Sequence, residues 1–181
     1  SVYEVTEIVA GDENETPNGQ RRGRVLACKV VDKDKVTKRN ALEKLRSEVT
    51  IHSKLRHPNL VRFERFFEDR YSVYMLLELC PNKSMLELQQ ARIRLTEPEV
   101  RYYASQLIDG LRYMHQDMLV IHRDIKLGNL FLGHNFELKI GDFGLAAQLD
   151  DDRQRKRTIC GTPNYIAPEI LASRHDGRGH S

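Results

Sequence analysis

The sequence predicts an α+β fold in two parts, a smaller one rich in strands followed by a larger one rich in helices. Residues 1–79 hold alternating and β-branched apolar runs, which are typical of strands, with one stretch at helical spacing. In residues 80–181 apolar side chains instead recur every three or four positions, as along one face of a helix. With 40% hydrophobic residues, the 181-residue chain can build one medium core or two small ones.

The composition argues against several classes of protein. The 29 Lys and Arg residues nearly balance the 26 Asp and Glu residues, and a net charge of +3 gives no reason to expect a nucleic-acid partner. Cys28, Cys80 and Cys160 are far apart, which indicates reduced thiols rather than disulfides or a zinc site. No stretch approaches the roughly 18 apolar residues of a membrane span, and no signal peptide is evident. We therefore expect a protein of the cytoplasm or nucleus with no membrane partner.

Short apolar runs and the turns between them define the elements of the first part. Alternation in VYEVTEIV predicts a strand at 2–9, and the polar residues 11–23 predict a loop into a second strand at 24–32, so the pair forms a hairpin. Apolar residues at near-helical spacing predict an amphipathic helix at 38–55. Two strand-like segments follow, at 60–67 and 71–79.

Two capping boxes mark helix starts in the second part. In Ser84–Glu87 and Thr96–Glu99 a hydroxyl residue is followed three positions later by a glutamate that can reach back to its amide. After the second box the apolar repeat predicts a long helix at 97–115 with one buried stripe. Short strands around tight turns are expected at 119–121, 129–132 and 136–140.

The apolar run VIHRDIKLGNLFL at 120–132 is interrupted by charged and polar residues. Because burying unpaired charge is costly, the interruption indicates either a solvated loop or an organised site. As a site, Asn129 of this loop and Asp142 of the GDFG sequence could hold Mg²⁺, which prefers oxygen ligands. Asp124 would then act as a base and Lys126 would neutralise a transferring phosphoryl group. The alternative is a solvated acidic turn with a structural asparagine.

The motifs HRDIKLGN and DFG match the signature of protein kinases, and the chain resembles a eukaryotic protein kinase. LACK at 26–29 resembles the kinase strand that carries a lysine, Glu48 follows Lys29 by 19 residues in the predicted helix, and APE occurs at 167–169. Four segments narrow the resemblance to the polo-like serine/threonine kinases. They are LELCPNKSMLEL at 77–88, LTEPEVRYY at 95–103, HRDIKLGNLFL at 122–132 and TICGTPNYIAPEIL at 158–171.

This resemblance implies a two-lobed protein-kinase-like fold. The small lobe would lie in 1–79, and the large lobe, through the activation segment, in 80–181. The resemblance also implies a domain incomplete at both ends. The family's first strand and glycine-rich loop are expected before this chain, and its central helix and later elements after it.

The resemblance assigns a catalytic role to four residues of the second part. Asp124 would accept or orient the proton of the substrate hydroxyl, and Lys126 would contact the γ-phosphate of ATP. Asn129 and Asp142 would hold Mg²⁺. The intact motifs favour this reading over the solvated turn.

The resemblance also implies a nucleotide pocket. Lys29 would hold the α- and β-phosphates and pair with Glu48, and Phe143 would pack against the helix that carries Glu48. The adenine contacts would be Ala27 and Phe131 on its two faces, Leu77 at the back, and the backbone of Glu78 and Cys80. Apart from Lys29 and Glu48, these residues could equally be plain core.

An activation segment is implied between Asp142 and Glu169. Thr158 resembles the family's phosphorylation site, where an upstream activating kinase would add a phosphate for Arg123 to engage. The alternative is an ordinary loop threonine. Thr162 is expected to support the catalytic loop, the segment HRDIKLGN at 122–129, rather than to accept phosphate.

Two classes of function follow. The first is ATP- and Mg²⁺-dependent transfer of phosphate to serine or threonine of protein substrates, with a cell-cycle or mitotic role and a place at the spindle pole or centrosome implied by the resemblance alone. The second, suggested by the incomplete ends, is a non-catalytic fragment that binds nucleotide or a partner; the isolated chain would then phosphorylate poorly. A small-molecule phosphotransferase is a weaker third, because GTPNYIAPE resembles the segment that receives peptide substrates.

Overall fold

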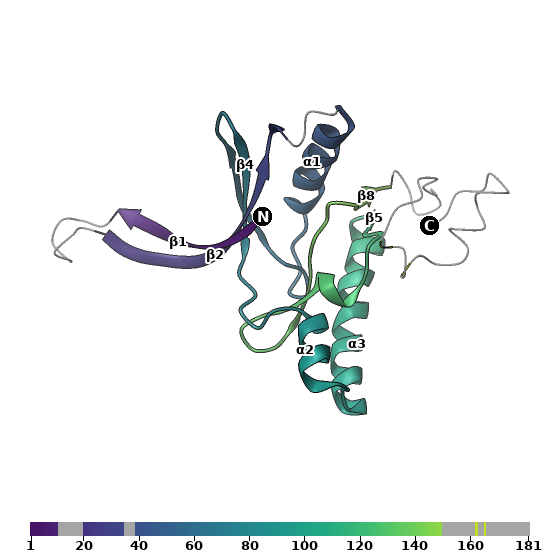
Figure 1. The fold of residues 1–181 in the computed structure, drawn as a ribbon. Coiled ribbons are helices and arrows are strands. Elements are labelled where there is room, and N and C mark those ends of the chain that lie inside the picture. Colours follow the sequence, from purple (N-terminus) through teal and green to yellow (C-terminus); the bar gives the residue numbers. More distant parts are fainter. Residues whose placement is uncertain (11–19, 35–38, 150–161, 163–164, 166–181) are drawn as a thin grey trace.

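The computed structural model describes residues 1–10, 20–34, 39–149, 162 and 165, which form a strand-rich part and a helix-rich part (Figure 1). The predictions for Thr158 and for the APE sequence at 167–169 lie outside the described residues. Within the described part, no helix has both the length and the apolar character needed to cross a membrane.

A four-stranded antiparallel sheet forms the small lobe. Its strands are β1 (Val2–Ala10), β2 (Gln20–Asp32), β3 (Phe63–Glu68) and β4 (Ser72–Glu78), in the order β1-β2-β4-β3. The predicted hairpin is confirmed, but its second strand begins at Gln20, inside the segment 11–23 that was predicted as loop. β1 and β2 pair and project well past β4 in Figure 1. The register places Lys29 opposite Met75 and Ala27 opposite Leu77. The predicted site residues Ala27, Lys29 and Leu77 therefore come from the two paired central strands, β2 and β4.

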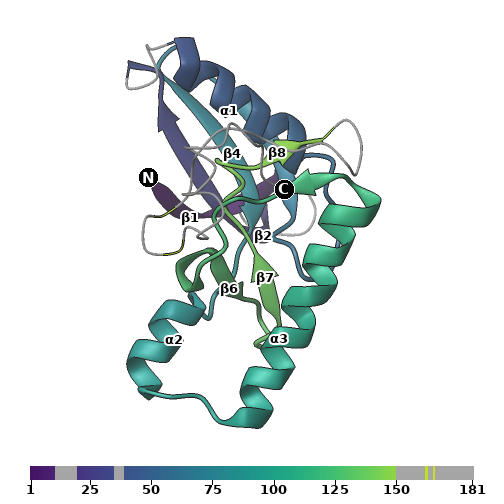
Figure 2. The ribbon, with the colours of Figure 1, turned by 90° about the vertical axis from the view of Figure 1, so that its right-hand side faces the viewer.

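The helix of the small lobe, α1 (Arg39–His52), lies beside the sheet in both views (Figures 1 and 2). Leu45 of α1 is buried with Phe63, Val73 and Met75 of the sheet. Val73 and Met75 are two positions apart on β4, so they share one face of the sheet and present it to the helix. This apolar contact fixes α1, and with it Glu48, relative to β2.

The two α-helices that the structure describes in the large lobe begin where the capping boxes predict. In α2 (Met85–Arg92) the Glu87 carboxylate accepts hydrogen bonds from the amide and hydroxyl of Ser84 at 2.8 and 2.6 Å. In α3 (Glu97–Arg112) Glu99 accepts the same two bonds from Thr96, both at 2.7 Å. The helix predicted at 97–115 is confirmed, but the α-helix ends at Arg112 and continues as a π-helical turn at Tyr113–Asp117.

Short strands make up much of the rest of the large lobe, as far as Leu149. β6 (Leu130–Leu132) pairs with β7 (Leu138–Ile140), and β5 (Val120–Ile121) pairs with β8 (Ala147–Gln148). The three strands expected here are confirmed, whereas β8 was not anticipated. A single 3₁₀ turn at Leu127–Asn129 joins the catalytic-loop sequence to β6.

Residues 60 and 61 connect the two lobes. Leu60 forms a parallel bridge with Ile140 of β7, and the Val61 amide donates to the Ile140 carbonyl at 2.8 Å. The predicted strand at 60–67 therefore begins only at Phe63, because Leu60 and Val61 pair with the large lobe instead of with β4. This pairing ties the small-lobe sheet to the strand that leads directly into Asp142.

Candidate active site

A cavity of about 460 Å³ lies between the lobes. Its wall contains the nine residues that the sequence predicts for the nucleotide and metal sites: Ala27, Lys29, Glu48, Leu77, Glu78, Cys80, Asn129, Phe131 and Asp142. They come from β2, α1, β4 and the segment after it, the 3₁₀ turn, β6 and the loop after β7. Residues from widely separated parts of the sequence thus meet at one cavity of a size typical of ligand sites.

Lys29 forms the charged centre of the cavity. Its Nζ atom lies 2.6 Å from Glu48 Oε1 and 3.2 Å from Asp142 Oδ1. Burial by itself would lower the pKa of Lys29, but the two carboxylates outweigh it and raise the pKa above its usual value. The ammonium group therefore stays charged and bridges the small lobe, through Glu48 of α1, to the large lobe, through Asp142.

The backbone around Asp142 is specialised. Asp142 has a φ of 61°, in the left-handed region that non-glycine residues seldom adopt. At Gly141, a Cβ atom would lie 2.9 Å from the Phe131 ring and 2.9 Å from Val61. Close packing therefore requires glycine at position 141. The Asp142 side chain lines the cavity, where 47% of its surface is exposed.

Asp124 is the centre of a hydrogen-bond network at the edge of this cavity. Its Oδ2 atom accepts from Lys126 Nζ at 2.7 Å and from Asn129 Nδ2 at 3.0 Å. Its Oδ1 atom accepts from the amide and the hydroxyl of Thr162 at 2.9 and 2.7 Å. Burial alone would raise the pKa of Asp124, but these donors, with the charge of Lys126, hold the pKa below its usual value. Asp124 is therefore an oriented, ionised carboxylate.

Thr162, which lies 38 positions after Asp124 in the sequence, joins this network. Besides its two bonds to Asp124, its hydroxyl accepts a hydrogen bond from Lys126 Nζ at 2.6 Å. The prediction that Thr162 supports the catalytic loop is confirmed.

Two residues of the catalytic loop connect it to the segment after β7. Arg123 also has a left-handed φ, 65°, and its Nε atom donates to the Leu145 carbonyl at 2.7 Å. The His122 ring is buried, 3.0 Å from the Gly141 carbonyl, and contacts the Phe143 ring at a centroid distance of 5.2 Å. These contacts hold the loop of Asp124 against the segment of Asp142.

Phe143 packs against the end of α1, as predicted. The buried His52, the last residue of α1, lies 4.3 Å from the Phe143 ring and 5.4 Å from the Phe63 ring, measured between centroids. His52 Nε2 is 2.7 Å from the Val61 carbonyl oxygen and must donate to it. Glu48 lies one helical turn before His52, so this packing also positions the partner of Lys29.

The donor atoms suit a magnesium ion held partly by phosphate and water. Asn129 uses Nδ2 to bond Asp124, which leaves its amide oxygen for a cation, and Asp142 offers a carboxylate in the same cavity. Among the described residues no group of three or more His, Cys, Asp and Glu side chains could hold a metal. Mg²⁺ fits this sparse oxygen set because it keeps several waters and binds through few protein ligands.

Some lining residues were not found from the sequence. Val2, His52, Val61 and Leu79 also line the cavity. Val61 carries no motif signal, His52 was interpreted only as a helix-end residue, and Val2 was identified only as the valine that follows the family's glycine-rich loop, without a contact to the nucleotide. The Lys126–Thr162 bond joins residues 36 positions apart, so no local pattern could have indicated it.

The sequence model of the protein kinase domain matches residues 17–180. The chain therefore belongs to the protein kinase family. Its similarity within that family is to the polo-like serine/threonine kinases.

Three relatives illustrate this similarity. The chain is 52% identical over 157 residues to serine/threonine-protein kinase polo of Drosophila melanogaster, which covers 87% of this chain and 26% of the relative. It is 52% identical over 155 residues to the cell cycle serine/threonine-protein kinase CDC5/MSD2 of Saccharomyces cerevisiae (86% and 22%). It is 47% identical over 154 residues to PLK2 of Mus musculus (85% and 22%). The chain thus spans about a quarter of the length of these relatives.

Proposed function

We propose that the protein carrying this chain transfers the γ-phosphate of ATP to serine or threonine of protein substrates in the cell cycle. The observation that carries the proposal is the meeting of two arrangements in one place: the Lys29–Glu48–Asp142 charge bridge inside a cavity, and the ionised Asp124 beside it. A cavity with one fixed cation and two oxygen ligands suits a triphosphate with Mg²⁺, and an oriented carboxylate suits a hydroxyl nucleophile.

Each residue then has a defined part in the reaction. Asn129 and Asp142 would hold Mg²⁺, which neutralises negative charge on the phosphates when bound. Lys29 orients the phosphate chain in the cavity. Asp124 accepts the hydrogen bond of the attacking hydroxyl and orients its oxygen, since its low pKa keeps it ionised. Lys126, next to Asp124, offers an ammonium group to the charge that moves in the transition state.

Substrate class, regulation and location belong to the same proposal. The yeast relative is named as a cell cycle kinase, which supports a cell-cycle role. Phosphorylation of Thr158 by an upstream kinase would switch the activation segment, with Arg123 as the partner of the phosphate. We further propose a cytoplasmic and nuclear protein that acts at the spindle pole or centrosome, from the polo-like resemblance.

Substitution of the proposed base tests the reaction. We expect Asp124→Asn to lower phosphate transfer to a protein substrate by about 10²- to 10⁴-fold, because the amide cannot accept the hydroxyl proton. The affinity for ATP should stay nearly unchanged, since Asp124 is not part of the cavity wall. The matched control is Asp117→Asn, an exposed residue of the π-helical turn. Undiminished transfer by Asp124→Asn would contradict the assignment.

A further inference from the structure

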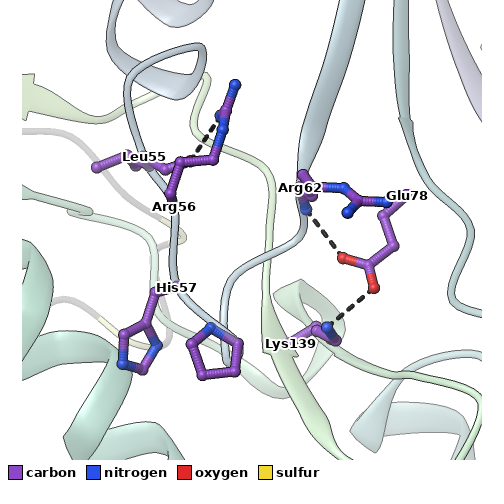
Figure 3. Close-up of a pocket in the computed structure, with 7 residues that line it drawn as sticks. Leu55, Arg56, His57, Arg62, Glu78 and Lys139 are labelled. Carbon is purple, nitrogen blue, oxygen red and sulfur yellow. Dashed lines mark hydrogen bonds and ion pairs between the residues drawn. The ribbon is translucent and has the colours of Figure 1, made fainter.

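Besides the contact between Lys29 and Asp142, a second ion pair joins the two lobes, at the end of β4. Lys139 Nζ of β7 lies 2.9 Å from Oε1 of Glu78, the last residue of β4. The main-chain amide of Arg62 donates to Glu78 Oε2 at 3.1 Å, and the Glu78 amide donates to the Arg62 carbonyl at 2.9 Å. Figure 3 shows Lys139 and the Arg62 amide reaching the Glu78 carboxylate from different sides. Both carboxylate oxygens of Glu78 therefore have a fixed partner.

Burial distinguishes this ion pair from the pairs on the surface. Only 10% of the Lys139 side chain and 24% of the Glu78 side chain are exposed. An ammonium group in such a position is costly unless a carboxylate accompanies it. Glu137 Oε1 also lies near Lys139 Nζ, but at 3.8 Å, so Glu78 is the closer partner. The buried charge of Lys139 thus holds the Glu78 side chain in one place.

Lys139 is positioned by the strand that leads into the active site. It lies next to Ile140, whose carbonyl accepts the hydrogen bond from the Val61 amide. Its cross-strand partner on β6 is Phe131, which lines the nucleotide cavity. Lys139 itself does not line that cavity. Any effect of Lys139 on a bound nucleotide must therefore pass through another residue.

Glu78 is the residue that can transmit such an effect. The four consecutive residues from Leu77 to Cys80 all line the nucleotide cavity. Leu79 and Cys80 lie beyond the end of β4, so their position depends on how Glu78 is held. The adenine contacts that the family resemblance implies are backbone groups of Glu78 and Cys80. Hydrogen bonds from backbone groups require exact placement, because a displacement of about 1 Å removes their favourable geometry.

We propose that Lys139 is a positioning residue for adenine, because its ion pair with Glu78 holds residues 78–80 where their backbone can select the base. The inference rests on the proposed function, since it requires ATP in the nucleotide cavity. It gives Lys139 no contact with the nucleotide and no part in phosphate transfer. Without the ammonium group, the partly exposed Glu78 carboxylate can turn to water, and the segment after β4 loses an anchor.

The preference for ATP over GTP tests this role, because the two nucleotides share their phosphates and differ in the base. Their dissociation constants, each with Mg²⁺, are measured on the protein that carries this chain by displacement of a fluorescent ATP analogue. Lys139→Met keeps a long side chain without the charge. We expect it to weaken ATP binding by roughly tenfold, the effect of one lost hydrogen bond, and GTP binding by less than about twofold.

A second variant breaks the same ion pair from its other side. Glu78→Gln leaves the backbone of residue 78 chemically unchanged and should also lower the preference for ATP, so the test remains available if Lys139→Met does not fold. The double variant should lose no more of the preference than Lys139→Met alone, because both substitutions act on one pair. Lys139→Arg keeps the charge and should retain most of the preference. The control Lys54→Met, at an exposed position after α1, should leave it unchanged.

Two results would overturn the proposal. Equal weakening of ATP and GTP binding in Lys139→Met would show that the ion pair only stabilises the fold. An unchanged preference in both Lys139→Met and Glu78→Gln would show that the pair does not act on the base. A parent protein that binds neither nucleotide would instead contradict the proposed function itself, and this inference with it.

Discussion

At the scale of single residues, the charged centre of the cavity has partners from both lobes. Lys29 is 2.6 Å from Glu48 in the small lobe and 3.2 Å from Asp142 in the large lobe. The sequence predicted the Lys29–Glu48 pair, because motif resemblance identifies both residues. It could not predict that His52, one turn after Glu48, would pack between Phe63 and Phe143. A histidine at a helix end has no sequence signal that separates a buried ring from an exposed one.

The buried His52 should make the stability of the chain depend on pH. Burial, with smaller effects from the nearby cations of Lys29 and Arg56, lowers the pKa of His52 from 6.5 to about 4. The unfolded state therefore binds the proton more readily between these values, so the contribution of His52 is complete above pH 6.5 and is lost as the pH falls toward 4. We therefore expect the titration of His52 to lower the free energy of unfolding by roughly 2 kcal/mol between pH 7.5 and pH 4.5.

Urea unfolding of the chain and of His52→Gln at both pH values measures this effect. Glutamine keeps an N–H donor for the Val61 carbonyl but does not titrate. At pH 7.5 the parent chain should have a higher free energy of unfolding than His52→Gln, and this difference should become smaller or change sign at pH 4.5. A gap that is the same at both pH values would show that His52 does not titrate as described.

At the scale of elements, the sequence predicted the helices and strands that have a clear periodic or turn pattern and missed those that have none. Both capping boxes and the β1–β2 hairpin followed from spacing and turn composition. The two-residue strand β8 was missed because two residues cannot show alternation. The late start of β3 was missed because the pairing of Leu60 with Ile140 joins residues 80 positions apart. Register between distant segments is set by tertiary packing, which local pattern does not encode.

The contact between α3 and β7 provides a prediction at this scale. A Cβ atom added at Gly110 would lie 2.9 Å from Ile140 and 3.3 Å from Leu60, both fully buried. Alanine would gain about 1 kcal/mol of helix propensity, but overpacking of a filled core costs about 1–3 kcal/mol. We therefore expect Gly110→Ala to lower the free energy of unfolding by roughly 1 kcal/mol.

The urea midpoint of Gly110→Ala measures this balance. Ser105→Ala, on the exposed side of α3, is the matched control and should change stability by less than about 0.5 kcal/mol. A Gly110→Ala variant more stable than the parent chain would mean that α3 and β7 are less tightly packed than the structure indicates.

At the scale of the whole molecule, the two lobes make the site only in combination. The small lobe contributes Lys29 and Glu48, the large lobe contributes Asn129 and Asp142, and the Val61–Ile140 hydrogen bond sets their separation. The resemblance predicted this division and nine residues of the cavity wall. The sequence predicted that Thr162 supports the catalytic loop, but it did not predict which atoms are involved. The two hydrogen bonds from Thr162 to Asp124 are evident only in the folded chain.

The measurement that tests the central claim most directly is the affinity for ATP with and without Mg²⁺. The account predicts ATP binding that Mg²⁺ strengthens, and loss of this strengthening in Asp142→Asn, because the amide is a weaker ligand than the carboxylate. The control Asp109→Asn, on the exposed face of α3, should keep the full magnesium effect. An affinity for ATP that is the same with and without Mg²⁺ would contradict the assignment of this cavity as the magnesium–nucleotide site. An undiminished effect of Mg²⁺ on the ATP affinity of Asp142→Asn would contradict it as well.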